Sequence, residues 1–308
     1  MSMRTGGAEE ILMQMKLRTA DNSREKIFPS PEQIRLIALD LDGTLLTSDK
    51  RLTQRNREAL SAAAAAGIEI VPATGRFYSG MPEEVRALDH VRYCILINGA
   101  LVIDSITGEK IYTAEIDTQD ALAFFEYLDD LPVIYDCYID SWGYMTGSMQ
   151  EKAGEYISNI HSLKMVRELR KPVPELKRYI LEGGYRPQKL QLFTRNDVPY
   201  RDYLLRELAE RFPDFSVTSS LPNNIEVNSS AADKGLALKA LADHLGISRS
   251  GLMAFGDSLN DIPMLRAAAW GVAMGNAHPA ATEAAVLQTA SCDEDGVAVI
   301  VEELLKIV

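Results

Sequence analysis

Two carboxylates separated by a single residue, Asp40 and Asp42, end the apolar run IRLIALDLD. In a β-strand, residues two apart project from the same face, so the two side chains would stand together. Carboxylates that close repel each other unless a cation lies between them, and Mg²⁺ is a hard cation that prefers oxygen ligands. The alternative is that each aspartate only caps a turn or a helix. On its own, the pair leaves both interpretations open.

A second acidic segment follows another apolar run, GLMAFGD. Asp257 ends this expected strand and could add a third carboxylate to the same cation. Asn260 and Asp261 open the next expected helix, where an amide can bind an anion at the N-terminus. The alternative is that Asp257 or Ser258 only caps that helix. From the residues alone, we expect Asp40, Asp42 and Asp257 to hold Mg²⁺.

Two further segments offer groups that suit a phosphate. Thr74 and Gly75 follow the run IEIVPA and supply a hydroxyl and exposed backbone N–H groups. Lys234 stands at the start of an expected helix, where its charge could neutralise a phosphate, although most lysines are only solvated. Together, the ends of four elements predict a Mg²⁺-assisted phosphate site.

Strands and helices alternate around these segments. The pattern predicts a strand at 34–41, a helix at 52–67, a strand at 68–73 and a third strand at 93–97. The alternation returns near the C-terminus, and an antiparallel hairpin is expected within 101–117. This order is typical of an α/β fold with a doubly wound, Rossmann-like parallel sheet, which binds ligands at its strand ends.

Residues 116–222 follow a different pattern, in which helices are mixed with short strands. This pattern predicts a smaller α+β domain inserted into the α/β core, which would comprise residues 34–115 and 223–308. Residues 1–33 precede the first strand, and we expect them to form a flexible extension.

The composition excludes several classes of protein. The chain has 308 residues and a formal charge of −12, so it lacks the basic face that nucleic-acid binding requires. No apolar run reaches the ~18 residues needed to span a bilayer. Cys94, Cys137 and Cys292 lie far apart, which fits a reducing cytosol. With no signal peptide in the N-terminal sequence, we expect a cytoplasmic protein that binds neither nucleic acid nor membrane. The oligomeric state is not indicated.

Four motifs in this order resemble the motif series of the haloacid dehalogenase superfamily. They are DLDGTLL, ATGR, DKG and FGDSLND. The insertion between the second and third motifs, together with LINGA, GNAHP and DEDGVA, is similar to the Cof-type phosphatases, which carry a cap domain of the C2B type. The resemblance covers residues 34–308.

The resemblance implies a role for each candidate residue. In such enzymes the first aspartate, here Asp40, attacks phosphorus and forms an aspartyl-phosphate. The second, Asp42, protonates the leaving oxygen and then activates water. Mg²⁺ would be held by Asp40, the backbone carbonyl of Asp42 and Asp257, with Asp261 supporting them. The groups that would hold the phosphoryl oxygens are the backbone of Leu41 together with Thr74, Gly75, Lys234 and Asn260.

The leading hypothesis is a Mg²⁺-dependent phosphatase that acts on small phosphorylated metabolites such as sugar phosphates. A phosphomutase and a non-catalytic, phospho-accepting signalling module are the alternatives. The insertion argues against the signalling module, because a switch needs no lid over its aspartate. His161 is a candidate substrate contact in the insertion. Tyr144 is expected in the apolar core of the inserted domain, with a substrate contact as the alternative. The substrate itself is not indicated.

Overall fold

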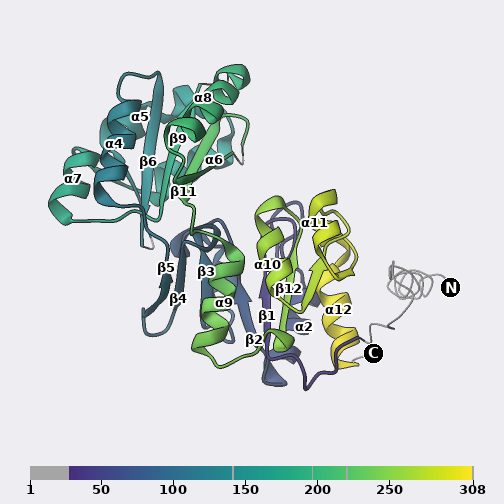
Figure 1. Ribbon diagram of the computed structural model, residues 1–308. Helices are drawn as coiled ribbons and strands as arrows, with labels where there is room; N and C mark the ends of the chain where they lie inside the picture. The colour runs from purple at the N-terminus through teal and green to yellow at the C-terminus, as the bar shows by residue number, and fades with distance from the viewer. Residues whose placement is uncertain (1–27, 141, 196, 220, 307–308) are drawn as a thin grey trace.

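The computed structural model describes residues 28–140, 142–195, 197–219 and 221–306, apart from the side chain of His161. In Figure 1 the chain forms two lobes. We call them the core lobe, at the lower right, and the inserted lobe, from α4 to β11, at the upper left. Residues 1–27 of the expected extension lie outside the described residues. Phe28 packs against the hydrophobic cluster of the core lobe, and Pro29 is buried.

The core lobe contains a five-stranded parallel sheet, which confirms the predicted doubly wound α/β fold. Its strands run in the order β14-β13-β12-β1-β2. Their bounds are β1 Leu36–Leu39, β2 Glu69–Pro72, β12 Leu252–Gly256, β13 Trp270–Ala273 and β14 Leu287–Gln288. Both faces of this sheet are covered by helices. The helices around it are α2 Gln54–Ala65, α9 Lys234–His244, α10 Ile262–Ala267, α11 Pro279–Ala284 and α12 Gly296–Leu305.

Alternation along β1 explains why the sheet is covered on both faces. Ile37 and Leu39 belong to the cluster that also contains residues of α2 and α12. Leu36 and Ala38 point the other way, into the cluster shared with α9 and α10. A strand buried on both faces reads as a continuous apolar run, which is the pattern that predicted it.

The third predicted strand belongs to another sheet. β3 (Tyr93–Leu96), β4 (Leu101–Asp104) and β5 (Lys110–Thr113) form a three-stranded antiparallel sheet. This confirms the expected hairpin but removes β3 from the parallel sheet. Among the described residues, the bridge Ala73↔Ile95 is what pairs β3 with that sheet. The physical reason is the tight turn after Leu96, which reverses the chain directly into β4.

The inserted lobe is built on a six-stranded sheet in the order β10-β11-β9-β6-β7-β8. Its strands are antiparallel except for the β7–β8 pair. Their bounds are β6 Val133–Ile139, β7 Trp142–Thr146, β8 Arg170–Val173, β9 Lys189–Thr194, β10 Phe215–Thr218 and β11 Asn224–Ser229. One face packs against α4, α7 and α8, and part of the other packs against α5 and α6. These helices are α4 Thr118–Leu128, α5 Gly147–Tyr156, α6 Ile160–Leu169, α7 Leu176–Gly183 and α8 Val198–Arg211.

The expected boundary between residues 222 and 223 is wrong by one strand. β11 pairs with β9 and β10, so it belongs to the sheet of the inserted lobe. Ile225 and Val227 are buried in that lobe's apolar cluster. The chain therefore returns to the core lobe after Ser229, shortly before α9. Within the described residues, no helix has the length and apolarity needed to cross a membrane.

Candidate active site

Three carboxylates converge at the carboxyl edge of the parallel sheet. Asp40 directly follows β1, Asp257 directly follows β12, and Asp261 lies one short turn further. Their oxygen atoms lie within 4.8 Å of one another. The backbone N–H of Asp40 donates to the carbonyl of Phe255 at 3.1 Å, which continues the pairing of β1 with β12 and holds the two strand ends together.

Lys234 supplies a positive charge to this cluster from the first turn of α9. Its Nζ donates to Asp40 Oδ1 and to Asp261 Oδ1, both at 2.6 Å, and its side chain is fully buried. Burial disfavours the ammonium, but the charges of Asp261 and Asp40 outweigh burial and raise the pKa of Lys234. Lys234 is therefore a permanent cation between two carboxylates.

One lysine does not balance three carboxylates. Burial raises the pKa of Asp40 to about 8, opposed by Lys234 and reinforced by Asp261 and Asp257. Burial, followed by the charge of Asp261, also raises the pKa of Asp257. A group of oxygen ligands with excess negative charge, two of its three residues buried, is the donor set that a divalent cation such as Mg²⁺ prefers. The residues present thus fit a divalent metal.

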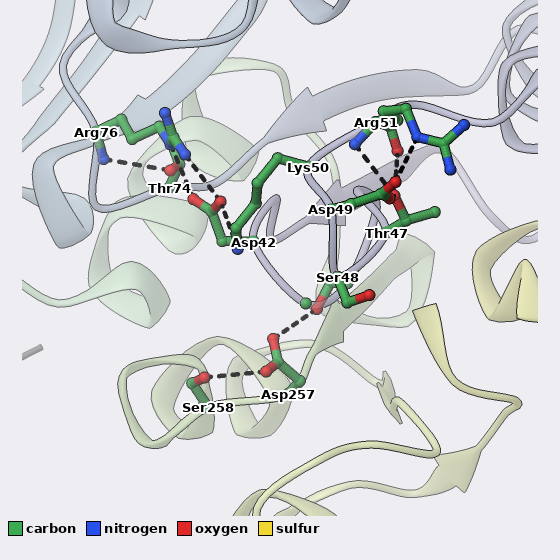
Figure 2. A network of polar contacts seen from close by, with 12 residues as sticks. Asp42, Thr47, Ser48, Asp49, Lys50, Arg51, Thr74, Arg76, Asp257 and Ser258 are labelled. Carbon is green, nitrogen blue, oxygen red and sulfur yellow. Dashed lines mark hydrogen bonds and ion pairs between the residues drawn. The ribbon is translucent and has the colours of Figure 1, made fainter. Parts of the chain in front are cut away.

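The carboxylate of Asp42 is not part of this group, contrary to the expectation from spacing. β1 ends at Leu39, so Asp40 and Asp42 lie beyond the strand and its alternation no longer aligns them. Instead, the Asp42 carboxylate accepts hydrogen bonds from Arg76 Nε and Nη2, both at 2.8 Å, and Lys50 Nζ lies 3.1 Å away (Figure 2). Burial alone would raise the pKa of Asp42, but Arg76 and Lys50 together lower it.

Hydroxyl groups orient the carboxylate of Asp257. Thr44 Oγ1 donates to its Oδ1 at 2.9 Å, and Ser258 Oγ donates to its Oδ2 at 3.1 Å, the latter drawn in Figure 2. Gly43 allows this close approach, because a Cβ at that position would lie 2.7 Å from Asp257 Oδ2. Gly43 also has a φ of +97°, which side chains rarely adopt.

Asp261 is held by backbone donors. Its Oδ2 accepts from the N–H groups of Asp257 and Ser258 at 3.0 and 2.9 Å, while its Oδ1 faces Lys234. A Cβ on Gly256 would lie 2.4 Å from the Cβ of Asp261, so only glycine leaves room for it. Ser258 is the N-cap of this turn and Asp261 is its capping-box partner, so the capping role expected of Ser258 is present, while Asp261 also approaches Asp40 and Asp257.

Of the candidate phosphate-binding residues, Lys234 contacts the carboxylates directly, and the others have partners of their own. Thr74 follows β2, and its hydroxyl accepts the N–H of Arg76 at 3.2 Å. Asn260 Nδ2 donates to Asn98 Oδ1 at 3.1 Å, and this same oxygen lies 2.7 Å from the place of a Cβ on Gly75. Leu41 has a buried side chain, and its carbonyl accepts the N–H of Leu46 at 2.8 Å, which leaves its backbone N–H as the group suited to a phosphate.

The fold and the geometry of the site agree with the known proteins that this chain resembles. The haloacid dehalogenase-like hydrolase family matches residues 37–301. The chain belongs to this family. The predicted resemblance and the predicted class of enzyme, a phosphomonoester hydrolase, are both confirmed.

Relatives of this hydrolase match over most of their length. Phosphatase YwpJ of Bacillus subtilis is 32% identical, with 88% of this chain and 100% of the relative covered. The 5-amino-6-(5-phospho-D-ribitylamino)uracil phosphatase YcsE of the same organism is 30% identical over 86% of this chain and 93% of its own. A haloacid dehalogenase-like hydrolase from Bacteroides thetaiotaomicron has a crystal structure that superposes with a TM-score of 0.76, at 27% identity, covering 88% of this chain and 99% of that one.

Sequence reasoning missed three residues around the site of this hydrolase. They are Arg76, Lys50 and Asn98. A signal existed for Arg76, since it is two residues from Thr74, but none identified its partner. Tyr144 packs against the apolar core of the inserted lobe, where its ring stacks on Tyr179 on the face covered by α7, which agrees with its expected core role rather than with a substrate contact. The side chain of His161 is outside the described residues.

Proposed function

We propose that this hydrolase releases phosphate from small phosphorylated metabolites, with Mg²⁺ as cofactor and a phosphoenzyme formed on Asp40. The observation that carries the proposal is the buried cluster at the sheet edge, in which Asp40 meets Asp257, Asp261 and the ammonium of Lys234. A nucleophile, a set of metal ligands and a cation for the phosphoryl group thus lie within one hydrogen-bonded unit.

Asp40 and Asp257 would hold the metal through carboxylate oxygens, Asp261 would support them, and Asp42 would contribute its backbone carbonyl. When bound, Mg²⁺ would neutralise charge on the phosphoryl group and on these carboxylates. Lys234, Thr74, Asn260 and the backbone N–H groups of Leu41 and Gly75 would bind the phosphoryl oxygens. Positioning and charge neutralisation of this kind supply most of the catalysis in phosphoryl transfer.

The reaction would proceed in two displacements at phosphorus. An oxygen of Asp40 attacks, the ester P–O bond breaks, and the leaving oxygen takes a proton from Asp42. In the second step, water attacks the phosphorus of the aspartyl-phosphate while Asp42 accepts its proton. The P–O bond to Asp40 then breaks, which restores the carboxylate and liberates phosphate.

Arg76 and Lys50 would assist the second step in particular. Their charges favour the carboxylate form of Asp42, which is the form that accepts a proton from water. The two hydrogen bonds from Arg76 also fix the direction of the carboxylate, as Figure 2 shows. Proton transfer depends on such alignment.

The inserted lobe would act as the cap of the site, with residues 116–229 in place of the 116–222 first expected. Both crossings between lobes lie close to the chemistry, since the chain returns just before Lys234. The named activity of one relative, on a phosphorylated ribitylaminouracil, supports a small phosphorylated metabolite as substrate. Relatives named as phosphatases favour hydrolysis over the phosphomutase and signalling alternatives.

The proposal is tested by trapping the phosphoenzyme. Asp42→Asn should form the aspartyl-phosphate from an activated aryl phosphate, whose leaving group needs no proton, and should hydrolyse it slowly. Intact mass after an acid quench should then show one added phosphoryl group, and peptide mapping should locate it on Asp40. Asp40→Asn is the matched control and should show neither label nor turnover. Turnover by Asp40→Asn at the wild-type rate would overturn the assignment.

A further inference from the structure

An unusual turn joins the active site to the inserted lobe. Ile97, Asn98 and Gly99 have consecutive φ values of +54°, +57° and +91°. A β-branched residue such as isoleucine is rarely found in this conformation, and strain of this kind clusters at functional sites. Contacts with the surrounding structure must therefore hold this strained turn in place, and its conformation marks it as a candidate functional element.

Contacts on two sides hold the turn in place. The backbone N–H of Ile97 donates to the carbonyl of Arg76, and that of Asn98 to the carbonyl of Thr74, both at 3.0 Å. On the other side, a Cβ on Gly99 would lie 2.4 Å from the carbonyl of Asp233, immediately before Lys234. The turn is thus clamped between the loop after β2 and the start of α9.

Held in this way, the carboxamide of Asn98 contacts residues of both lobes. Its Oδ1 accepts from Asn260 Nδ2 at 3.1 Å and lies over the backbone of Gly75. Its Nδ2 donates to Glu226 Oε2 at 3.5 Å, across to the inserted lobe. Asn98 therefore connects two candidate phosphate-binding residues with one carboxylate of the opposite lobe.

Glu226 lies on the polar part of the inserted sheet. It pairs with Gln191 of β9, which in turn pairs with Asp136 of β6, so the three side chains share one face. Lys189 Nζ donates to Glu226 Oε2 at 2.5 Å, and Asn224 Nδ2 donates to Oε1 at 3.1 Å. These contacts fix the carboxylate and offset its charge, and the residues concerned are buried.

We propose that Asn98 and Glu226 together recognise a hydroxyl group on the leaving group of the substrate. The contact between them is long for a hydrogen bond, so an entering hydroxyl can replace it by accepting from Asn98 Nδ2 and donating to Glu226. Asn98 contacts both Asn260 and Gly75, so a hydroxyl there would lie close to the transferred phosphoryl group. The inference rests on the proposed function and adds the residues that select a hydroxylated leaving group.

Selectivity follows from the hydrogen bond that is replaced. A substrate of the same size without the hydroxyl would separate Asn98 Nδ2 from Glu226 and offer neither group a hydrogen bond in exchange, although Lys189 and Asn224 still contact Glu226. Sites that are built to hydrogen-bond a hydroxyl discriminate strongly against analogues that lack it, for this reason. The preference should therefore depend on both side chains and should weaken when either is removed.

The test compares sn-glycerol 3-phosphate with n-propyl phosphate, which differ only in two hydroxyl groups. The readout is the ratio of their kcat/KM values. In the wild type the ratio should favour the glycerol ester, and in Glu226→Gln and in Asn98→Gly it should fall by roughly tenfold or more. Glycine adopts the positive φ of position 98 without strain, so Asn98→Gly should keep its thermal stability. If Asn98 had only a structural role, Asn98→Gly would leave the ratio of the two kcat/KM values unchanged.

Glu207→Gln is the matched control for Glu226→Gln, because both variants replace a glutamate of the inserted lobe by glutamine. Its carboxylate accepts a hydrogen bond from Tyr127 within that lobe, and its loss should leave the ratio at the wild-type value. A ratio that stays within twofold of the wild type in either folded variant overturns the inference, as does a wild type that prefers n-propyl phosphate. If the wild type released phosphate from no ester, including aryl phosphates, the proposed function itself would fail.

Discussion

The ammonium of Lys234 lies 2.6 Å from a carboxylate oxygen of Asp40, although 194 residues separate them in the sequence. The whole inserted lobe is encoded between the two. The contact forms because β1 occupies an inner position of the parallel sheet and α9 packs across that sheet, so the end of the strand meets the start of the helix (Figure 1). The proposed nucleophile and its counter-charge are thus positioned by the packing of β1 and α9.

Lys234→Met should lower both stability and turnover. The change leaves Asp40 and Asp261 buried without their cation, and removing one partner of a buried pair costs about 3–5 kcal/mol. Turnover should fall by about a hundredfold or more, as expected when a charge-stabilising donor is lost. Urea unfolding in chelator and phosphate release are the two measurements. Adding Asp40→Asn should recover part of the stability and none of the activity; a stable, fully active Lys234→Met enzyme would contradict the assigned role.

Arg76→Met should move the acid limb of the pH–activity profile to higher pH. Arg76 lowers the pKa of Asp42, so its removal raises that pKa toward the ordinary value. At a given acidic pH, less of Asp42 is then ionised, and water activation in the second step slows. The profile of kcat is measured with an aryl phosphate. Arg76→Lys, which keeps the charge, should shift the limb less, and a limb that moved to lower pH would disprove the explanation.

Removal of the metal should abolish activity and lower thermal stability. Mg²⁺ that binds only the folded protein stabilises it by about 2.7 kcal/mol when its free concentration is about 100-fold above Kd. Ca²⁺ should inhibit, because it accepts more ligands at longer distances and can engage both oxygens of Asp40. Phosphate release and melting curves are followed during chelation and readdition. Asp257→Asn should lose most of the Mg²⁺-dependent stabilisation, while full activity with verified metal depletion would refute the cofactor.

Gly99→Ala should destabilise the protein by roughly 2 kcal/mol or more, because the new methyl group meets the Asp233 carbonyl and the residue keeps a positive φ. Gly67→Ala is the matched control, since Gly67 also has a positive φ, +84°, but no atom lies within 4 Å of its Cβ position. Gly67→Ala should lower the free energy of unfolding only by the cost of placing a side chain at a positive φ, about 1–2 kcal/mol. Equal losses of unfolding free energy in the two variants would show that the close approach to α9 contributes nothing.

The sequence by itself determined the inner part of the parallel sheet and the residues that follow its strands, but it also assigned β3 to that sheet, which pairs with β4 instead. Asp40, Thr74 and Asp257 each follow an apolar run, and parallel strands present their carboxyl ends at one edge, so their approach was predictable. The smaller inserted α+β unit was predictable too, because its pattern of helices and short strands differs from that of the core.

Only the tertiary structure decided three matters. Asp42 turns to Arg76 and Lys50 rather than to Asp40, because the strand alternation that would align the aspartates ends at Leu39. β11 joins the inserted sheet because hydrogen bonding to β9, encoded far upstream, decides its partner. Asn98 reaches Glu226 because a strained turn is clamped by two distant segments. Local patterns specify strands and helices, whereas side-chain partners depend on contacts that form only when the whole chain has folded.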